Sequence, residues 1–271
     1  MQALNATALY WLADGVACDI PLINDTGAEP VLAELLAGYE VDFAIQRTEN
    51  RRKKMLIADM DSTMIEQECI DELAGMVGLK DQVAAITARA MNGEIAFEPA
   101  LRERVALLKG MSTNVVDEVI RDSITLMPGG RELLQTMRSN GAYTALVSGG
   151  FTDFTGPIAK TLGFHENRAN TLLANNGTFI GKVAEPILGK EAKLEALNDI
   201  TARLGISPAD AIAVGDGAND LLMLKAAGTG VALHAKPSVA AQAKIRLNFS
   251  DLTGLLYVQG YRQADFIYDP D

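Results

Sequence analysis

The sequence predicts an α/β protein in which a parallel-sheet core carries a helical insertion and a short α+β segment precedes both. Met55–Ala58 is an uninterrupted apolar run, as expected for a buried strand. Residues 65–124 show only helical spacings, and strand and helix patterns alternate from Gly129 onward. Because parallel strands end at the same edge of a sheet, we expect the ligand site in the loops that follow them.

Composition excludes several classes of protein. The 271 residues fit one large domain or a main domain with smaller additions, and the 48% hydrophobic content is enough for a sizeable core. A net charge of −11 argues against a nucleic-acid partner, which needs a basic surface. Cys18 and Cys69 match no metal motif and fit free thiols in a reducing compartment. Since neither a membrane span nor a secretory leader is evident, we expect a cytoplasmic protein without a membrane partner.

Residues 1–50 are expected to form a small α+β segment. Its elements are strands at Leu9–Leu12, Ala17–Leu22 and Val41–Ile45 and a helix at Glu29–Tyr39. So few elements cannot bury a core of their own. We therefore expect the segment to pack on the main domain or on a second subunit, which leaves a homodimer open, with Gln46–Lys53 as the linker.

Residues 65–124 are interpreted as a helical cap inserted into a core made of residues 54–64 and 125–271. The expected cap helices are Ile70–Val77, Gln82–Met91, Pro99–Leu108 and Val115–Ser123. In the core we expect strands at Tyr143–Val147 and Ala211–Val214, helices at Arg131–Asn140, Asp153–Leu162 and Glu191–Leu204, and a hairpin at Thr171–Ala174 and Thr178–Val183.

Two aspartates directly follow the first core strand. Residues i and i+2 of an extended stretch point to the same side, so Asp59 and Asp61 converge and repel unless a cation or a proton lies between them. A hard cation such as Mg²⁺ accepts carboxylate ligands and leaves room for a substrate phosphate. Taken alone, the pair is equally consistent with solvated loop acids that cap the next helix.

Two further strands end in polar loops at the same expected edge. Asp216 and Asp220 follow Ala211–Val214, and four acids at one edge indicate a cation. Ser148 follows Tyr143–Val147, and its hydroxyl forms a cradle for phosphate oxygens together with the amides of the next two glycines.

These loops resemble the ordered motifs of the haloacid dehalogenase (HAD) superfamily. The motifs are DMDST at 59–63, SGG at 148–150, GDGAND at 215–220 and a lysine that precedes this last motif. The helical insertion, Glu68 and the stretch 91–105 are similar to the phosphoserine phosphatases of that superfamily. The resemblance runs from residue 54 to the C-terminus. It implies a HAD-like Rossmannoid core with a small C1-type helical cap. The implied activity is Mg²⁺-dependent hydrolysis of O-phospho-L-serine, the last step of serine biosynthesis.

The resemblance also implies catalytic roles. Asp59 would be the nucleophile that forms an aspartyl phosphate, and Asp61 the general acid and base. One Mg²⁺ per site would be held by the Asp59 side chain, the backbone carbonyl of Asp61 and Asp216. Asp220 would not bind the metal directly and would instead orient Asn219 or a lysine.

The residues implied in substrate binding come from the core and from the cap. The core members are Ser148, Gly149, Lys193 and Asn219, with Lys190 as a competitor for the lysine role. In the cap, Arg104 suits the carboxylate of an amino acid and Glu68 suits its ammonium. Met91 and Phe97 are expected to wall the pocket, although packing inside the cap explains them almost as well.

Three alternatives remain open at this stage. The first is a HAD phosphatase or phosphotransferase for another small phosphomonoester, such as phosphothreonine or phosphohomoserine. The second is a non-enzymatic phospho-acceptor module, which the presence of Asp61 and of a cap disfavours. The third is amino-acid sensing by residues 1–50, for which no specifying residue is evident.

Overall fold

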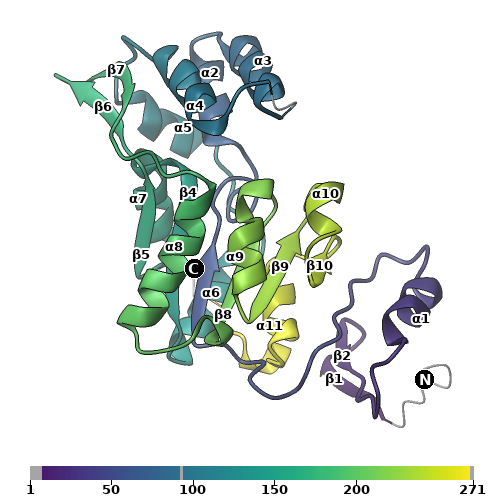
Figure 1. The fold of residues 1–271 in the computed structure, drawn as a ribbon. Helices are drawn as coiled ribbons and strands as arrows, with labels where there is room; N and C mark the ends of the chain where they lie inside the picture. The colour runs from purple at the N-terminus through teal and green to yellow at the C-terminus, as the bar shows by residue number, and fades with distance from the viewer. Residues whose placement is uncertain (1–7, 92–93, 269–271) are drawn as a thin grey trace.

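The core is a six-stranded parallel sheet in the order β10-β9-β8-β3-β4-β5 (Figure 1). The computed structural model describes residues 8–91 and 94–268. The strands are β3 Met55–Ala58, β4 Tyr143–Phe151, β5 Glu166–Asn170, β8 Ala211–Gly215, β9 Thr229–Leu233 and β10 Ile245–Leu247. Ala58, the last residue of β3, is in register with Leu146 of β4 and Val214 of β8. The three polar loops therefore meet at one edge, as the sequence predicts.

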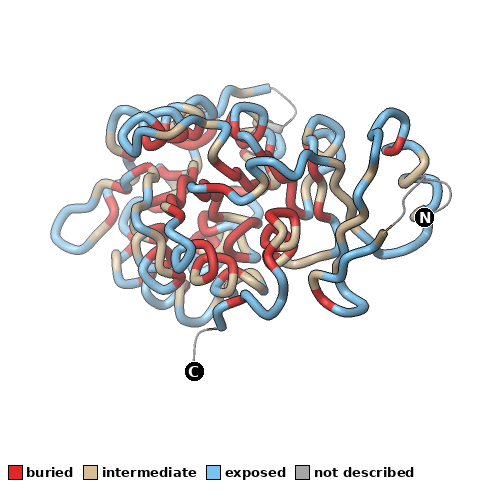
Figure 2. Tube along the Cα trace, turned by 90° about the horizontal axis from the view of Figure 1, so that it is seen from below, coloured by how far each residue is buried: buried red, intermediate tan, exposed pale blue. Residues whose placement is uncertain are grey.

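Helices cover both faces of the sheet because the strands are apolar on both sides. They are α6 Gly130–Ser139, α7 Thr152–Leu162, α8 Lys190–Arg203, α9 Leu221–Ala226, α10 Pro237–Ala240 and α11 Gly254–Val258. Met55 and Ile57 pack towards α8 and α9, whereas Leu56 and Ala58 pack towards α6, α7 and α11. Figure 2 shows these buried segments at the centre of the molecule. All four residues of β3 are fully buried, so the strand is a rigid base for Asp59.

The helical insertion forms a separate layer above the carboxyl ends of the strands (Figure 1). Its helices are α2 Cys69–Met76, α3 Lys80–Met91, α4 Phe97–Ala106 and α5 Val115–Asp122. The hairpin of β6 (Leu172–Asn175) and β7 (Thr178–Val183), which the sequence analysis counted with the core, packs beside α4, and the Gly110 amide donates to the Phe179 carbonyl.

Two chain segments connect the cap to the core, and they are hydrogen-bonded to each other. The Glu66 amide donates to the Thr125 carbonyl at 3.0 Å, and the Met127 amide donates to the Met64 carbonyl at 3.0 Å. This narrow paired junction is where a change in cap angle would be absorbed.

The N-terminal segment contains the hairpin β1 (Tyr10–Ala13) and β2 (Ala17–Asp19) and the helix α1 (Ala28–Leu35). The strand expected at Val41–Ile45 is wrong, since these residues pair with no strand in the described part of the chain. The alternating residue pattern does not produce alternating burial, because residues 42–45 are all half-buried and Ala44 packs against the core without a strand partner.

Polar contacts attach this segment to the core. The Asp42 carboxylate accepts hydrogen bonds from the amides of Asn248, Phe249 and Ser250 at 2.7, 3.0 and 2.9 Å. Arg51 pairs with Asp19 at 2.7 Å and donates to the Val258 carbonyl. The segment thus packs on the main domain, one of the two outcomes that its small size predicts.

Replacing Asp42 by Ala should detach this segment locally. Three backbone amides lose their charged acceptor, which costs about 1–3 kcal/mol. Limited proteolysis should then cut residues 36–50 faster than in the parent protein. Asp25→Ala, at an exposed position of the same segment, is the matched control. Equal cleavage of both variants would show that Asp42 does not anchor the segment.

Candidate active site

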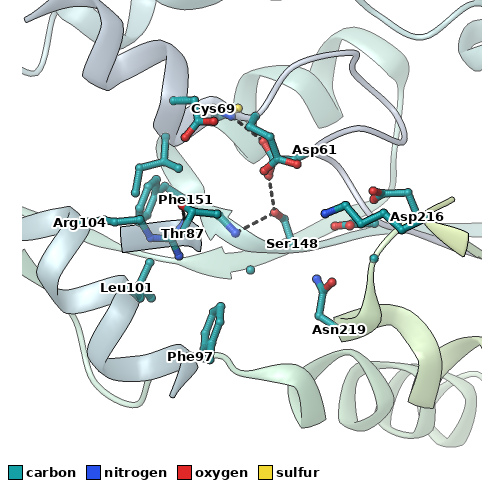
Figure 3. A pocket seen from close by; sticks show the side chains of 18 residues that line it. Asp61, Cys69, Thr87, Phe97, Leu101, Arg104, Ser148, Phe151, Asp216 and Asn219 are labelled. Carbon is teal, nitrogen blue, oxygen red and sulfur yellow. Dashed lines mark hydrogen bonds between the residues drawn. The ribbon is translucent and has the colours of Figure 1, made fainter. Parts of the chain in front are cut away.

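A cavity of about 460 Å³ lies between the cap and the carboxyl ends of the strands. Core residues and cap residues both line it, and Figure 3 shows their side chains converging from the two layers. Of the sequence-predicted residues, those on the cavity wall are Asp59, Asp61, Glu68, Phe97, Arg104, Ser148, Gly149, Asp216 and Asn219. The structure therefore brings together most of the set that the sequence pointed to.

Asp59 is held at the tip of β3 by the strand itself and by a buried ion pair. Its amide donates to the Val214 carbonyl at 3.0 Å, which ties it to β8. The Lys193 ammonium lies 2.6 Å from Asp59 Oδ1 and 2.5 Å from Asp220 Oδ1. Lys193 is 2% exposed and Asp220 is fully buried. Lys190, the competitor for the lysine role, pairs instead with Glu191 on the surface.

Electrostatics keep Lys193 charged. Burial alone would lower the pKa of Lys193, but the two carboxylates that it contacts raise it above its ordinary value. Burial and the neighbouring Asp220 raise the pKa of Asp59, while the ammonium acts in the opposite direction. Lys193 therefore serves as the permanent counter-charge of the two acids.

The acid cluster fits a divalent cation. Carboxylate oxygens of Asp59, Asp216 and Asp220 lie within 4.8 Å of one another. Burial, followed by repulsion from Asp220, raises the pKa of Asp216 to about 6. Lys193 balances only one of the three negative charges, and a hard cation would balance the rest.

Asp220 is less available to a metal than the other two acids. Its Oδ1 accepts from Lys193, and its Oδ2 accepts from the Gly217 amide at 2.9 Å. The carboxylate packs so closely on Gly215 that a side chain at that position would overlap it. These contacts suit the supporting role that the resemblance implies for Asp220.

Asp61 faces the cavity with both carboxylate oxygens engaged. Oδ2 accepts from the Ser148 hydroxyl at 3.2 Å, and Oδ1 accepts from the Cys69 amide at 2.8 Å. Ser148 Oγ in turn accepts from the Gly150 amide at 2.8 Å. A Cβ at Gly150 would lie 3.0 Å from Asp61 Oδ2, so the small residue keeps the two loops in contact.

The cap contributes two acids, Glu68 and Asp71, and one cation, Arg104, to the same cavity. Glu68 accepts from the Ser62 hydroxyl at 2.9 Å, and burial together with Asp61 raises the pKa of Glu68 to about 7. Arg104 donates to Thr87 Oγ1 at 3.4 Å, and burial lowers its pKa although Asp71 and Glu68 act against this. These groups provide a cation and two acids at the cap side of the cavity.

The remaining cap residues that the sequence pointed to have different outcomes. Phe97 lines the cavity, and its ring lies 3.7 Å from the position that a Cβ on Gly149 would take. Met91 ends α3, but its side chain lies outside the described part of the structure.

Several residues of the site were missed by the sequence analysis, among them Asp71 and Thr87 beside Arg104, and two others in the core. Lys236 lines the cavity and acts on Asp216, and it follows a strand in the same way as the motif loops. Asn170 is buried and donates to the Gly149 carbonyl at 2.9 Å, which fixes the phosphate-cradle loop. Asn170 ends the polar strand β5, and this strand has no hydrophobic pattern that would have predicted it from the sequence.

This geometry places an acid-rich strand edge beneath a helical cap, which is the arrangement of a phosphoryl-transfer enzyme. The haloacid dehalogenase-like hydrolase family matches residues 56–225, and the chain is a member of it. A phosphoserine phosphatase from Polaromonas sp. is 44% identical over 82% of this chain and 97% of the relative. Within the superfamily, the chain belongs to the phosphoserine phosphatase family.

Solved structures agree with this assignment. A HAD family hydrolase from Salmonella enterica serovar Typhi has a TM-score of 0.80 at 35% identity, covering 84% of this chain and 78% of that one. A phospho-aspartyl intermediate analogue of phosphoserine phosphatase has a TM-score of 0.70 at 38% identity, covering 76% of this chain and 98% of the other. The expected α/β fold class is confirmed.

Replacing Lys193 by Met should strongly destabilise the protein, because Asp59 and Asp220 lose their shared counter-charge. Removing one member of a buried pair costs roughly 3–5 kcal/mol. Urea denaturation without Mg²⁺ should show the loss, and added Mg²⁺ should recover part of it. Lys190→Met, at the exposed neighbouring position, should unfold like the parent. Equal midpoints for the two variants would refute the role given to Lys193.

Proposed function

We propose that this protein hydrolyses O-phospho-L-serine to L-serine and phosphate, with Mg²⁺ and through an aspartyl phosphate on Asp59. The observation that carries the proposal is the composition of a single cavity. Its core side presents a rigid carboxylate, Asp59, beside a phosphate cradle, and its cap side presents Glu68 and Arg104. A phosphorylated amino acid has matching groups at its two ends.

The phosphate end would be bound by the core. Ser148 and Gly149 line the cavity beside Asp61, where the Ser148 hydroxyl and the Gly149 amide would donate hydrogen bonds to the phosphate oxygens. Lys193, in contact with Asp59, opposes the rise in the pKa of that carboxylate and holds it in place, and it is the lysine expected to reach a bound phosphate. Asn219 lines the same wall.

The metal would be held by the Asp59 carboxylate, the Asp61 carbonyl and Asp216. When bound, Mg²⁺ would reduce the repulsion between a carboxylate nucleophile and a phosphate dianion. Asp59 Oδ then attacks phosphorus, and the bond to the serine oxygen breaks.

Asp61 would act in both halves of the reaction. It first gives a proton to the departing serine oxygen, and it later removes a proton from the water that attacks the aspartyl phosphate. Its position two residues after Asp59, on the same side of the loop, lets it reach the oxygen that leaves and the water that replaces it.

The amino-acid end would be recognised by the cap. Arg104 would pair with the substrate carboxylate and Glu68 with its ammonium, while Phe97 covers the bound molecule. Both groups line the cavity, with Arg104 half-buried and Glu68 more exposed, and they have no use in a site that binds phosphate alone. This favours phosphoserine over phosphomonoesters that lack an amino-acid end. It also favours an enzyme over a phospho-acceptor module.

The biological setting follows from the reaction. Release of serine from its phosphate ester would be the last step of serine biosynthesis, and we expect it in the cytoplasm. None of the helices in residues 8–91 and 94–268 is long and apolar enough to cross a membrane.

A panel of phosphomonoesters tests the proposed substrate. Phosphate release with Mg²⁺ should be fastest from O-phospho-L-serine, and EDTA should abolish it for every substrate. Phosphothreonine, phosphohomoserine and phosphoethanolamine are the closest comparisons, and the last of these lacks the carboxylate. A higher kcat/KM for any of them would replace phosphoserine as the substrate.

Removing the cap charges should separate recognition from chemistry. Arg104→Ala or Glu68→Gln leaves one charged substrate group desolvated without a partner, which costs about 2–5 kcal/mol. The kcat/KM for phosphoserine should therefore fall by orders of magnitude. That for p-nitrophenyl phosphate, which has neither group, should change little. A parallel loss on both substrates would mean that these residues shape the cap and do not recognise serine.

The raised pKa of Glu68 predicts a pH dependence. Below its value of about 7, Glu68 is protonated and no longer attracts the substrate ammonium. The ratio of kcat/KM for phosphoserine to that for p-nitrophenyl phosphate should fall as the pH drops from 8 to 6. Taking the ratio cancels groups that act on both substrates. Glu68→Gln should flatten the ratio, and an unchanged slope in that variant would assign the titration to another group.

A further inference from the structure

Asp61 lies at the joint between the core and the cap. Its Oδ2 accepts from Ser148 Oγ, which belongs to the core, and its Oδ1 accepts from the amide of Cys69, the first residue of the first cap helix (Figure 3). The two hydrogen bonds hold the carboxylate from opposite sides. The hydrogen bond from the Cys69 amide depends on the position of the cap.

The Cys69 amide is available to Asp61 because of its place in α2. The first four amides of a helix have no acceptor within the helix, and the partial positive charge at that end favours a carboxylate. Within the described chain, the side chain of the N-cap residue Glu68 does not cap the helix. The acceptor that the structure gives to the Cys69 amide is Asp61 Oδ1, at 2.8 Å.

The thiol of Cys69 is separable from its amide. The side chain is 2% exposed, and burial, followed by the charge of Asp61 and a hydrogen bond to it, raises the pKa of the thiol well above its ordinary value, so it stays neutral. The neutral thiol is therefore a weak donor to Asp61. The backbone amide is the stronger of the two donors that this position offers.

Along the chain, the junction between core and cap lies between Asp61 and Cys69. Met64 and Glu66 hydrogen-bond across to Met127 and Thr125 where the two crossing segments pair. A rotation of the cap about this junction would move Cys69 relative to Asp61, whereas Ser148 would stay with the core.

We propose that Cys69 is a positioning residue whose backbone amide aligns the Asp61 carboxylate for proton transfer when the cap is seated on the core. The inference rests on the proposed function. With Oδ1 fixed by Cys69, Oδ2 faces Ser148 and the phosphate cradle, where the serine oxygen departs and the water enters. Asp61 releases one proton in the first step and takes one back in the second, so the same alignment serves both. Cap closure and acid–base catalysis are thereby coupled through the contact between Cys69 and Asp61.

The variant Cys69→Pro removes this donor with little change to the helix. Proline is favoured at the first helical position, and the preceding Glu68, at φ −97° and ψ 110°, already has the conformation that a residue before proline adopts. Cys69→Ala keeps the amide and removes the thiol, so it is the matched control.

The expected result is a loss in kcat specific to the proline variant. Misalignment of a catalytic group can cost up to roughly 100-fold, so kcat of Cys69→Pro on phosphoserine should fall about 10- to 100-fold with KM nearly unchanged. Cys69→Ala, which keeps the amide and loses only the weak thiol donor, should lose several-fold less activity than Cys69→Pro. In rapid-quench experiments with p-nitrophenyl phosphate, whose leaving group needs no proton, the phosphoenzyme should still form in Cys69→Pro and should decay more slowly.

Other outcomes would overturn the inference. Parent-like kinetics in Cys69→Pro would remove any role for the amide, and an equal loss in Cys69→Pro and Cys69→Ala would assign the effect to the thiol. A faster Cys69→Pro enzyme would mean that the bond holds Asp61 away from its working position. If the parent protein shows neither turnover nor a phosphoenzyme, the proposed function itself has failed.

Amide hydrogen exchange tests the same bond without altering position 69. Exchange of the Cys69 amide should be markedly faster in Asp61→Ala than in the parent, while amides in the middle of α2 should exchange as before. This measurement remains decisive if Cys69→Pro does not fold. Equal protection in the two proteins would show that Asp61 is not the acceptor in solution.

Discussion

The structure depends on one electrostatic constraint, which is the concentration of negative charge at the buried end of β3. Asp59 and Asp220 share the ammonium of Lys193, and Asp216 adds a third carboxylate within 4.8 Å. An unpaired buried charge costs several kcal/mol. The sheet can hold these acids together because β3 is fully buried and hydrogen-bonded on both sides. The remaining negative charge fits a divalent cation, and a bound cation would in turn attract a phosphate.

The cap turns this charged edge into a selective site. It closes the cavity with groups of its own, of which Glu68 and Arg104 are charged and Phe97 is apolar. It also supplies the amide that holds Asp61. Under the proposed function, the core alone would provide phosphate chemistry without discrimination, since the groups proposed to recognise the amino-acid end come from the insertion. The narrow paired junction around Glu66 and Thr125 connects the two functions mechanically.

The parts of this account that the sequence predicts are those with local signals. The apolar run of β3 and the polar loops that end the strands are evident without a structure, because buried strands and the acids after them are contiguous in the chain. The edge strand β5 and the short strand β10 gave no comparable signal, since β5 is polar and β10 has only three residues. Asn170 and Lys236 act through contacts far apart in sequence. The Cys69 amide is a backbone group, which no pattern of side chains can mark.

The central claim is that Asp59 carries the phosphoryl group, and the most direct test is to find that group on the protein. Rapid acid quench after mixing with ³²P-labelled phosphoserine, followed by peptide mapping, should place an acid-stable, alkali-labile acyl phosphate on the peptide that contains Asp59. Asp59→Asn should show neither label nor turnover. Label on another residue, or full turnover by Asp59→Asn, would contradict the account.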